Sequence, residues 1–152
     1  MNHVFSSLRV VGKLGLDYHL LTKKQSSYNI CPMTKPIGFM QGRLSPDPEG
    51  LYQFSPQDWE AELPIAKEMG FDCVEWLFDW RDYAGNPILG DLKVLESIKN
   101  SAEENNIDIS SICADYFMKH KLIGEESQQS LMVLNRLITA AQYLGIKIIA
   151  IP

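Results

Sequence analysis

A repeated junction between a helix and a strand constrains the fold of this chain more than any other feature. The junctions are Gly70-Phe71-Asp72, Asn106-Ile107-Asp108 and Gly145-Ile146-Lys147. Each follows an amphipathic helical stretch, precedes a short apolar run, and recurs after 36 and then 39 residues. A period of this length, holding one helix and one strand, is typical of a repeating βα unit.

The repeat predicts four strands that alternate with three helices. We expect strands at 37–40, 71–78, 107–113 and 146–151, and helices at 55–69, with a kink at Pro64, at 91–105 and at 131–144. Apolar strands joined by helices indicate an α/β fold with a parallel sheet. Four strands and three helices in residues 36–152 are half of an eight-stranded TIM barrel, a partial (βα)8 barrel. The expected fold is therefore a parallel half-barrel, and a small open doubly wound sheet is the alternative.

The first 32 residues differ from the rest of the chain. Residues 1–36 hold five Lys or Arg and one Asp, and no clean period runs through 1–32. We expect residues 1–32 to be a poorly structured basic extension, with a transit peptide as the alternative, and residues 33–152 to be the folded part. The strand at 146–151 should then lie at an exposed edge, where a homo-oligomer can form by strand pairing.

Composition excludes several function classes. The net charge of −5 makes nucleic-acid binding unlikely. Apolar runs stay far below eighteen residues, so no membrane-spanning helix is expected. Three cysteines without a CxxC pair predict neither a disulfide framework nor a zinc ribbon, which favours a reduced, cytoplasmic protein.

A family resemblance enters at the first predicted strands. The run Ile37-Gly38-Phe39-Met40-Gln41-Gly42-Arg43-Leu44-Ser45-Pro46, with Met69-Gly70-Phe71-Asp72 and Val74-Glu75-Trp76, resembles the amino-terminal half of the sugar phosphate isomerase/epimerase family. That family belongs to the xylose-isomerase-like TIM barrels, and the resemblance covers residues 33–152.

The resemblance implies a sugar or sugar phosphate substrate and proton transfer next to a carbonyl. It also implies a divalent metal, held by carboxylates and histidine on later strands of the barrel. No residue here matches those ligands, so we expect no metal ligand, cofactor or catalytic residue in this chain, and no activity of the chain alone.

Strand periodicity nominates the residues that line a site. Val74, Trp76 and Phe78 should face the helices, and Cys73, Glu75 and Leu77 the other side. Aligning the repeats puts Ser111 and Ala150 level with Glu75, and Asp115 level with Asp79. Because such barrels keep their chemistry at the carboxyl ends of the strands, the candidate substrate-binding residues are Gln41, Arg43, Glu75, Asp79 and Asp115, with Tyr116 and His120 behind them.

Structural roles are the alternatives for these residues. Arg43 suits a phosphate or carboxylate, or pairs with Glu75 or Asp79. Asp79 and Asp115 are placed to cap local backbone, and His120 between two lysines is typical of a solvated loop. We expect the three tryptophans, Cys73 and Cys113 to be packing residues. For the whole chain, two alternatives are a half-barrel that assembles with itself or a partner and a flavodoxin-like binding or regulatory module.

Overall fold

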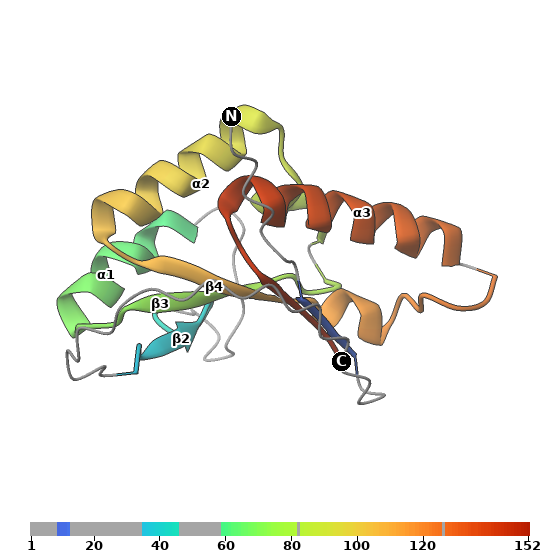
Figure 1. Cartoon of the computed structure of the whole chain (residues 1–152), viewed down its shortest axis with the longest axis horizontal. Helices are drawn as coiled ribbons and strands as arrows, with labels where there is room; N and C mark the ends of the chain where they lie inside the picture. Colours follow the sequence, from blue (N-terminus) through green and yellow to red (C-terminus); the bar gives the residue numbers. More distant parts are fainter. Residues whose placement is uncertain (1–8, 13–34, 46–58, 82, 126) are drawn as a thin grey trace, which may run out of the picture.

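A computed structural model describes residues 9–12, 35–45, 59–81, 83–125 and 127–152, which form one parallel sheet with helices on one side (Figure 1). The strands are β1 (Arg9–Gly12), β2 (Gly38–Met40), β3 (Cys73–Leu77), β4 (Asp108–Cys113) and β5 (Ile148–Ile151). The helices are α1 (Glu62–Met69), α2 (Leu92–Asn105) and α3 (Ser127–Leu144). In the described part of the chain, none of the helices is both long and apolar enough to cross a membrane.

The strands from β2 to β5 are added in one direction. The order in the sheet is β1-β5-β4-β3-β2, and every neighbouring pair is parallel. Right-handed crossovers that all advance in the same direction place their helices on the same face of a sheet. Figure 1 shows this arrangement, with α1, α2 and α3 on one side of the strands. The predicted α/β fold with helices between parallel strands is thus confirmed.

The three helix–strand junctions close in the same way. Each helix ends in a left-handed residue, with φ of 80° at Gly70, 55° at Asn106 and 75° at Gly145. The next residue in each case donates its backbone N–H to an alanine carbonyl one turn back in the helix. These bonds are Phe71 to Ala66 at 3.0 Å, Ile107 to Ala102 at 3.0 Å and Ile146 to Ala141 at 2.8 Å. The sequence repeat is therefore a repeat of one local structure.

The first helix begins later than predicted. Residues 59–61 form a 3-10 turn, α1 starts at Glu62, and Pro64 is its third residue. The expected kink at Pro64 is wrong, because an amide in the first turn has no intrahelical acceptor to lose. The predicted start at Ser55 lies outside the described residues. Helix α2 begins as predicted, with the Asp91 carboxylate accepting from the amides of Lys93 and Val94 at 3.0 and 3.1 Å.

Strand β1 departs from the prediction for the N-terminal segment. Of residues 1–32, the structure describes Arg9–Gly12, and these residues pair in parallel with Ile148–Ile151. The β-branched pair Val10-Val11 favours such a strand. The expectation that the last strand lies at an edge is therefore wrong, because β5 has β4 on one side and β1 on the other. The described edges of the sheet are β1 and β2.

The two faces of the sheet differ as the periodicity predicts. Val74, Trp76 and Phe78 are almost fully buried against the helices, together with Ile112 and Ile149. On the opposite face Glu75, Ser111, Cys113 and Ala150 are only partly buried, whereas Leu77 at the strand end is buried. Among the described residues, no helix covers this opposite face, which we call the open face.

Candidate functional site

Two neighbouring strands place a carboxylate and a hydroxyl together on the open face. Glu75 pairs in register with Ser111, as predicted, and Ser111 Oγ donates to Glu75 Oε1 at 2.9 Å. Both side chains are half-buried, so the pair remains accessible to a ligand. A carboxylate and a hydroxyl at this spacing can bind the hydroxyl groups of a small polar molecule.

Ala150 does not lie at the predicted level. It pairs with Cys113, which pairs with Leu77, so it sits two residues further along the sheet than Glu75. The alignment of repeats assumed equal spacing from junction to strand, but β5 starts at Ile148 and its register is offset. In β5, Ile148 therefore lies closer than Ala150 to the level of Glu75 and Ser111 in the sheet.

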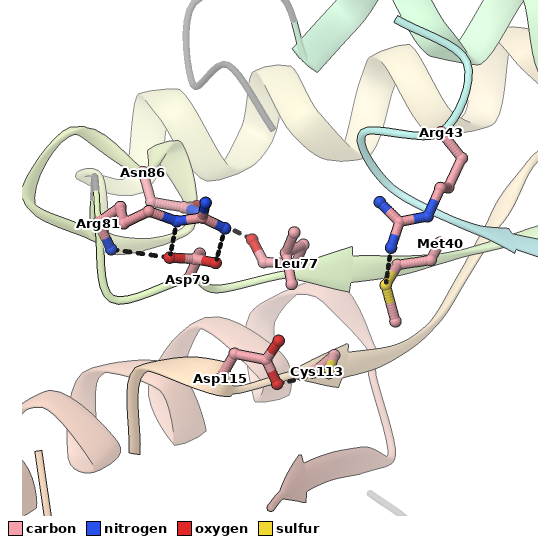
Figure 2. Close-up of polar contacts among 8 residues, drawn as sticks. All are labelled: Met40, Arg43, Leu77, Asp79, Arg81, Asn86, Cys113 and Asp115. Atoms are coloured by element: carbon pink, nitrogen blue, oxygen red, sulfur yellow. Dashed lines mark hydrogen bonds and ion pairs between the residues drawn. The ribbon is translucent and has the colours of Figure 1, made fainter. Parts of the chain in front are cut away.

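Asp115 lies beside a thiol at the end of β4. Cys113 Sγ donates to Asp115 Oδ1 at 3.3 Å (Figure 2). Burial, the charge and hydrogen bond of Asp115, and the charges of Glu75 and Asp79 together raise the pKa of the Cys113 thiol to about 12. The thiol therefore stays protonated at neutral pH, which agrees with the prediction that it is no nucleophile. Of the predicted side chains, Asp115 contacts this thiol directly, whereas Glu75 and Asp79 act on it through their charges.

Asp79 is engaged locally. Its carboxylate accepts from the Arg81 backbone amide at 2.8 Å, from Nε at 3.0 Å and from Nη2 at 2.8 Å (Figure 2). The side-chain hydrogen bond of Arg81, with its backbone amide and charge, holds the pKa of Asp79 below its usual value, against the effect of partial burial. The capping role given above as the alternative is the one that the structure displays.

Gln41 and Arg43 follow β2 at the same edge of the sheet. The backbone N–H of Gln41 donates to the backbone carbonyl of Glu75 at 3.0 Å. The side-chain Oε1 of Gln41 accepts from the backbone N–H of Leu77 at 3.1 Å. Gln41 is 2% exposed, so its side chain extends the pairing of β2 with β3. Arg43 is exposed, with Nη2 3.7 Å from Met40 Sδ (Figure 2). The charged group of Arg43 thus lies at the carboxyl edge of the sheet, as predicted.

Sequence reasoning missed a buried carboxylate that fixes the loop after β2. Glu62 is 1% exposed, and its two oxygens accept from the Gly42 amide at 3.0 and 2.8 Å. Its Oε1 also accepts from the amides of Leu44 and Ser45, both at 2.8 Å. The burial of Glu62 could have been predicted from its position in the sequence. Glu62 lies three residues after the buried Trp59, and helical periodicity therefore gives it a core position.

Asn86 fixes the loop after β3, and it was also missed. Its Oδ1 accepts from Trp76 Nε1 at 3.0 Å and from Ile88 N at 3.2 Å, and its Nδ2 donates to Leu77 O at 2.9 Å. The Asn86-Pro87 dipeptide is a recognised turn signal. Buried polar side chains therefore hold the loops after both β2 and β3.

The aromatic residues divide into core and rim. Trp59 and Trp76 are buried with ring centroids 5.7 Å apart, as predicted. Trp80 is 39% exposed, with Arg81 Cζ 5.7 Å and Lys119 Nζ 5.4 Å from its ring centroid, so the packing role predicted for it is wrong. It follows the end of β3, where the chain leaves the sheet. His120 is not a solvated residue either, because it is half-buried and stacks on Tyr116 at 4.2 Å.

The described side chains do not fit the divalent metal that the family resemblance implies. In residues 9–12, 35–45, 59–81, 83–125 and 127–152, no group of three or more His, Cys, Asp or Glu side chains is arranged to hold a metal ion. The carboxylates near Cys113 are engaged with Ser111, Arg81 and the thiol itself. What this edge of the sheet offers is a set of hydrogen-bonding groups.

No protein-family model matches the chain, and no curated protein matches it. The family assignment therefore rests on the motif in residues 37–46 and the junction in residues 69–76, and it stays a prediction.

Proposed function

We propose that the chain forms part of the wall of a xylose-isomerase-like barrel, and that a sugar or sugar phosphate binds against its open face. The observation that carries this proposal is the single direction in which β2 to β5 are added, with every helix on one side. In a (βα)8 barrel the helices form the outer layer and the opposite face points to the interior. A flavodoxin-like module instead reverses its strand order and has helices on both faces.

The stagger of the strands supports the same proposal. Ala150 lies level with Leu77 across the sheet, two residues beyond the position given by aligning the repeats. Closing a sheet into a barrel requires such an offset to accumulate from strand to strand. The offset arises between β4, which presents Ser111, and β5, whereas β3 and β4 pair at the predicted level.

The chemistry of the open face suits substrate binding. The Glu75–Ser111 pair can bind sugar hydroxyls, and the exposed guanidinium of Arg43 suits a phosphate. The parent reaction is isomerisation or epimerisation by proton transfer next to a carbonyl. Because the described side chains do not fit a metal centre, we assign them to substrate binding and expect the chain alone to bind without isomerising.

A titration followed by amide NMR tests this proposal. Fructose 6-phosphate and fructose are added separately to the full chain, and we expect signals of Glu75, Ser111 and Cys113 to shift. Glu75→Gln should weaken binding, whereas Glu68→Gln, which removes an exposed charge on α1, should leave it unchanged. Shifts confined to the helix side, or none with either sugar, would contradict the proposal. Isomerisation by the purified chain with Mg²⁺ or Mn²⁺ would contradict the assignment to binding alone.

Self-assembly is a second candidate, favoured by the two edges of the sheet. Strands β1 and β2 each have one paired side in the described part of the chain, so each can accept a strand from a second copy. Sedimentation velocity separates the two candidates, because a monomer across a wide concentration range would exclude assembly through these edges.

A further inference from the structure

The loop after β2 is held from the helix side by a single carboxylate. Glu62, at the start of α1, accepts hydrogen bonds from the backbone N–H groups of Gly42, Leu44 and Ser45 at 2.8–3.0 Å. These three residues flank Arg43 on both sides. Gly42 has a φ of 85°, a left-handed value that glycine adopts without steric cost. The backbone on either side of Arg43 is therefore fixed by one buried side chain.

The guanidinium of Arg43 lies on the other face of the sheet. Phe39 pairs with Val74, and both belong to the core under the helices. The next residue, Met40, pairs in register with Glu75, so it points to the open face, because side chains alternate along a strand. Arg43 Nη2 is 3.7 Å from Met40 Sδ, and Figure 2 shows the guanidinium turned toward Met40. The loop thus directs its amides to α1 and its charged side chain to the open face.

This placement puts Arg43 at one end of a row of polar groups. Met40, Glu75 and Ser111 are register partners on three neighbouring strands. Neighbouring strands are about 4.8 Å apart, so a group above Met40 lies roughly 10 Å from Ser111. One small ligand can therefore place an anionic group on Arg43 and its hydroxyl groups on the Glu75–Ser111 pair.

A loop that is fixed before the ligand arrives favours binding. An arginine on an unfixed loop loses backbone freedom as well as side-chain freedom when it binds an anion. Fixing the loop beforehand removes the backbone part of this cost. Because Glu62 is 1% exposed and lies on the helix side of the loop, it does not reach the ligand itself and acts through Arg43.

We propose that Glu62 is a positioning residue, which sets Arg43 over the open face to bind the anionic group of a ligand whose hydroxyl groups bind Glu75 and Ser111. The inference rests on the function proposed above. It adds that affinity for the anionic group, as distinct from the sugar, depends on a side chain on the helix side of the sheet.

A comparison of fructose 6-phosphate with fructose tests the inference. Both are titrated into the full chain and followed by amide NMR. The dissociation constant of fructose divided by that of fructose 6-phosphate measures the preference for the phosphate. Arg43→Ala should lower this preference about tenfold, and Glu62→Gln about threefold, because an amide nitrogen then replaces one of the accepting oxygens. Affinity for fructose should stay the same in both variants. Glu60→Gln, which removes a neighbouring exposed carboxylate, is the matched control and should change neither quantity.

The double variant separates positioning from general stability. If Glu62 acts through Arg43, Glu62→Gln should no longer change the preference in an Arg43→Ala background. A preference that is unchanged by either single variant, or that Glu62→Gln lowers equally in both backgrounds, would overturn the inference. In that case, shifts of Glu75 and Ser111 with both sugars would still support the proposed function. Absence of these shifts with either sugar would refute the proposed function and the inference with it.

Discussion

Removing the Glu62 carboxylate should destabilise the fold and release the loop after β2. In Glu62→Ala, the amides of Gly42, Leu44 and Ser45 lose their acceptor together. The Gly42 amide is buried, so leaving it unpaired costs about 1–3 kcal/mol, and the two half-buried amides can bind water instead. We expect a total loss of about 2–4 kcal/mol in the free energy of unfolding. Glu62→Gln should lose about half of this, since its carbonyl oxygen can still accept.

Urea denaturation followed by tryptophan fluorescence measures the loss. The matched control is Glu60→Gln, which removes a neighbouring but exposed carboxylate and should change the free energy of unfolding by less than about 0.5 kcal/mol. Amide signals of Gly42, Leu44 and Ser45 should also move upfield in Glu62→Ala, because their hydrogen bonds weaken. A Glu62→Ala protein as stable as Glu60→Gln would refute the claim that this carboxylate holds the loop.

Three further predictions concern the other side chains of this edge. Asn86→Ala should lower the free energy of unfolding by about 2–4 kcal/mol, measured by urea denaturation, because one side chain satisfies three buried partners. Arg81→Met should raise the pKa of Asp79 toward its usual value, as read by carboxyl ¹³C NMR. Its stability loss relative to the unmodified chain should be present at neutral pH and vanish as the pH falls through the lowered pKa. The free energy of unfolding should fall as pH rises from about 9 to about 12, because only the unfolded chain then ionises Cys113, and this fall should shrink in Cys113→Ala.

The local parts of the fold could be predicted from the sequence. The helix–strand junctions, the Asp91 cap and the burial of Val74, Trp76 and Phe78 all depend on residues close in the chain. Periodicity and turn residues report on such local structure directly.

The long-range parts could not be predicted in the same way. Pairing of β1 with β5 joins segments more than 130 residues apart, and the offset of β5 is set by packing across the sheet. In the candidate site, the level of Ser111 was predictable, whereas the partners of Asp79 and Asp115 depend on side-chain geometry. Glu62 and Asn86 were missed because, apart from the Trp76 indole N–H that Asn86 accepts, their partners are backbone groups, which have no signature in a sequence.

The central claim is that helices cover only one face of the sheet. The most direct test of this claim is a measurement of which face is open to solvent. Methyl NMR with a soluble gadolinium chelate measures this, because the relaxation of a methyl group rises as the chelate approaches it. We predict strong relaxation for the methyl groups of Ile148 and Ala150, and weak relaxation for those of Ile112 and Ile149, which pack under the helices. Equal protection of both sets in the monomer would contradict a one-sided sheet, and with it the barrel wall that we propose.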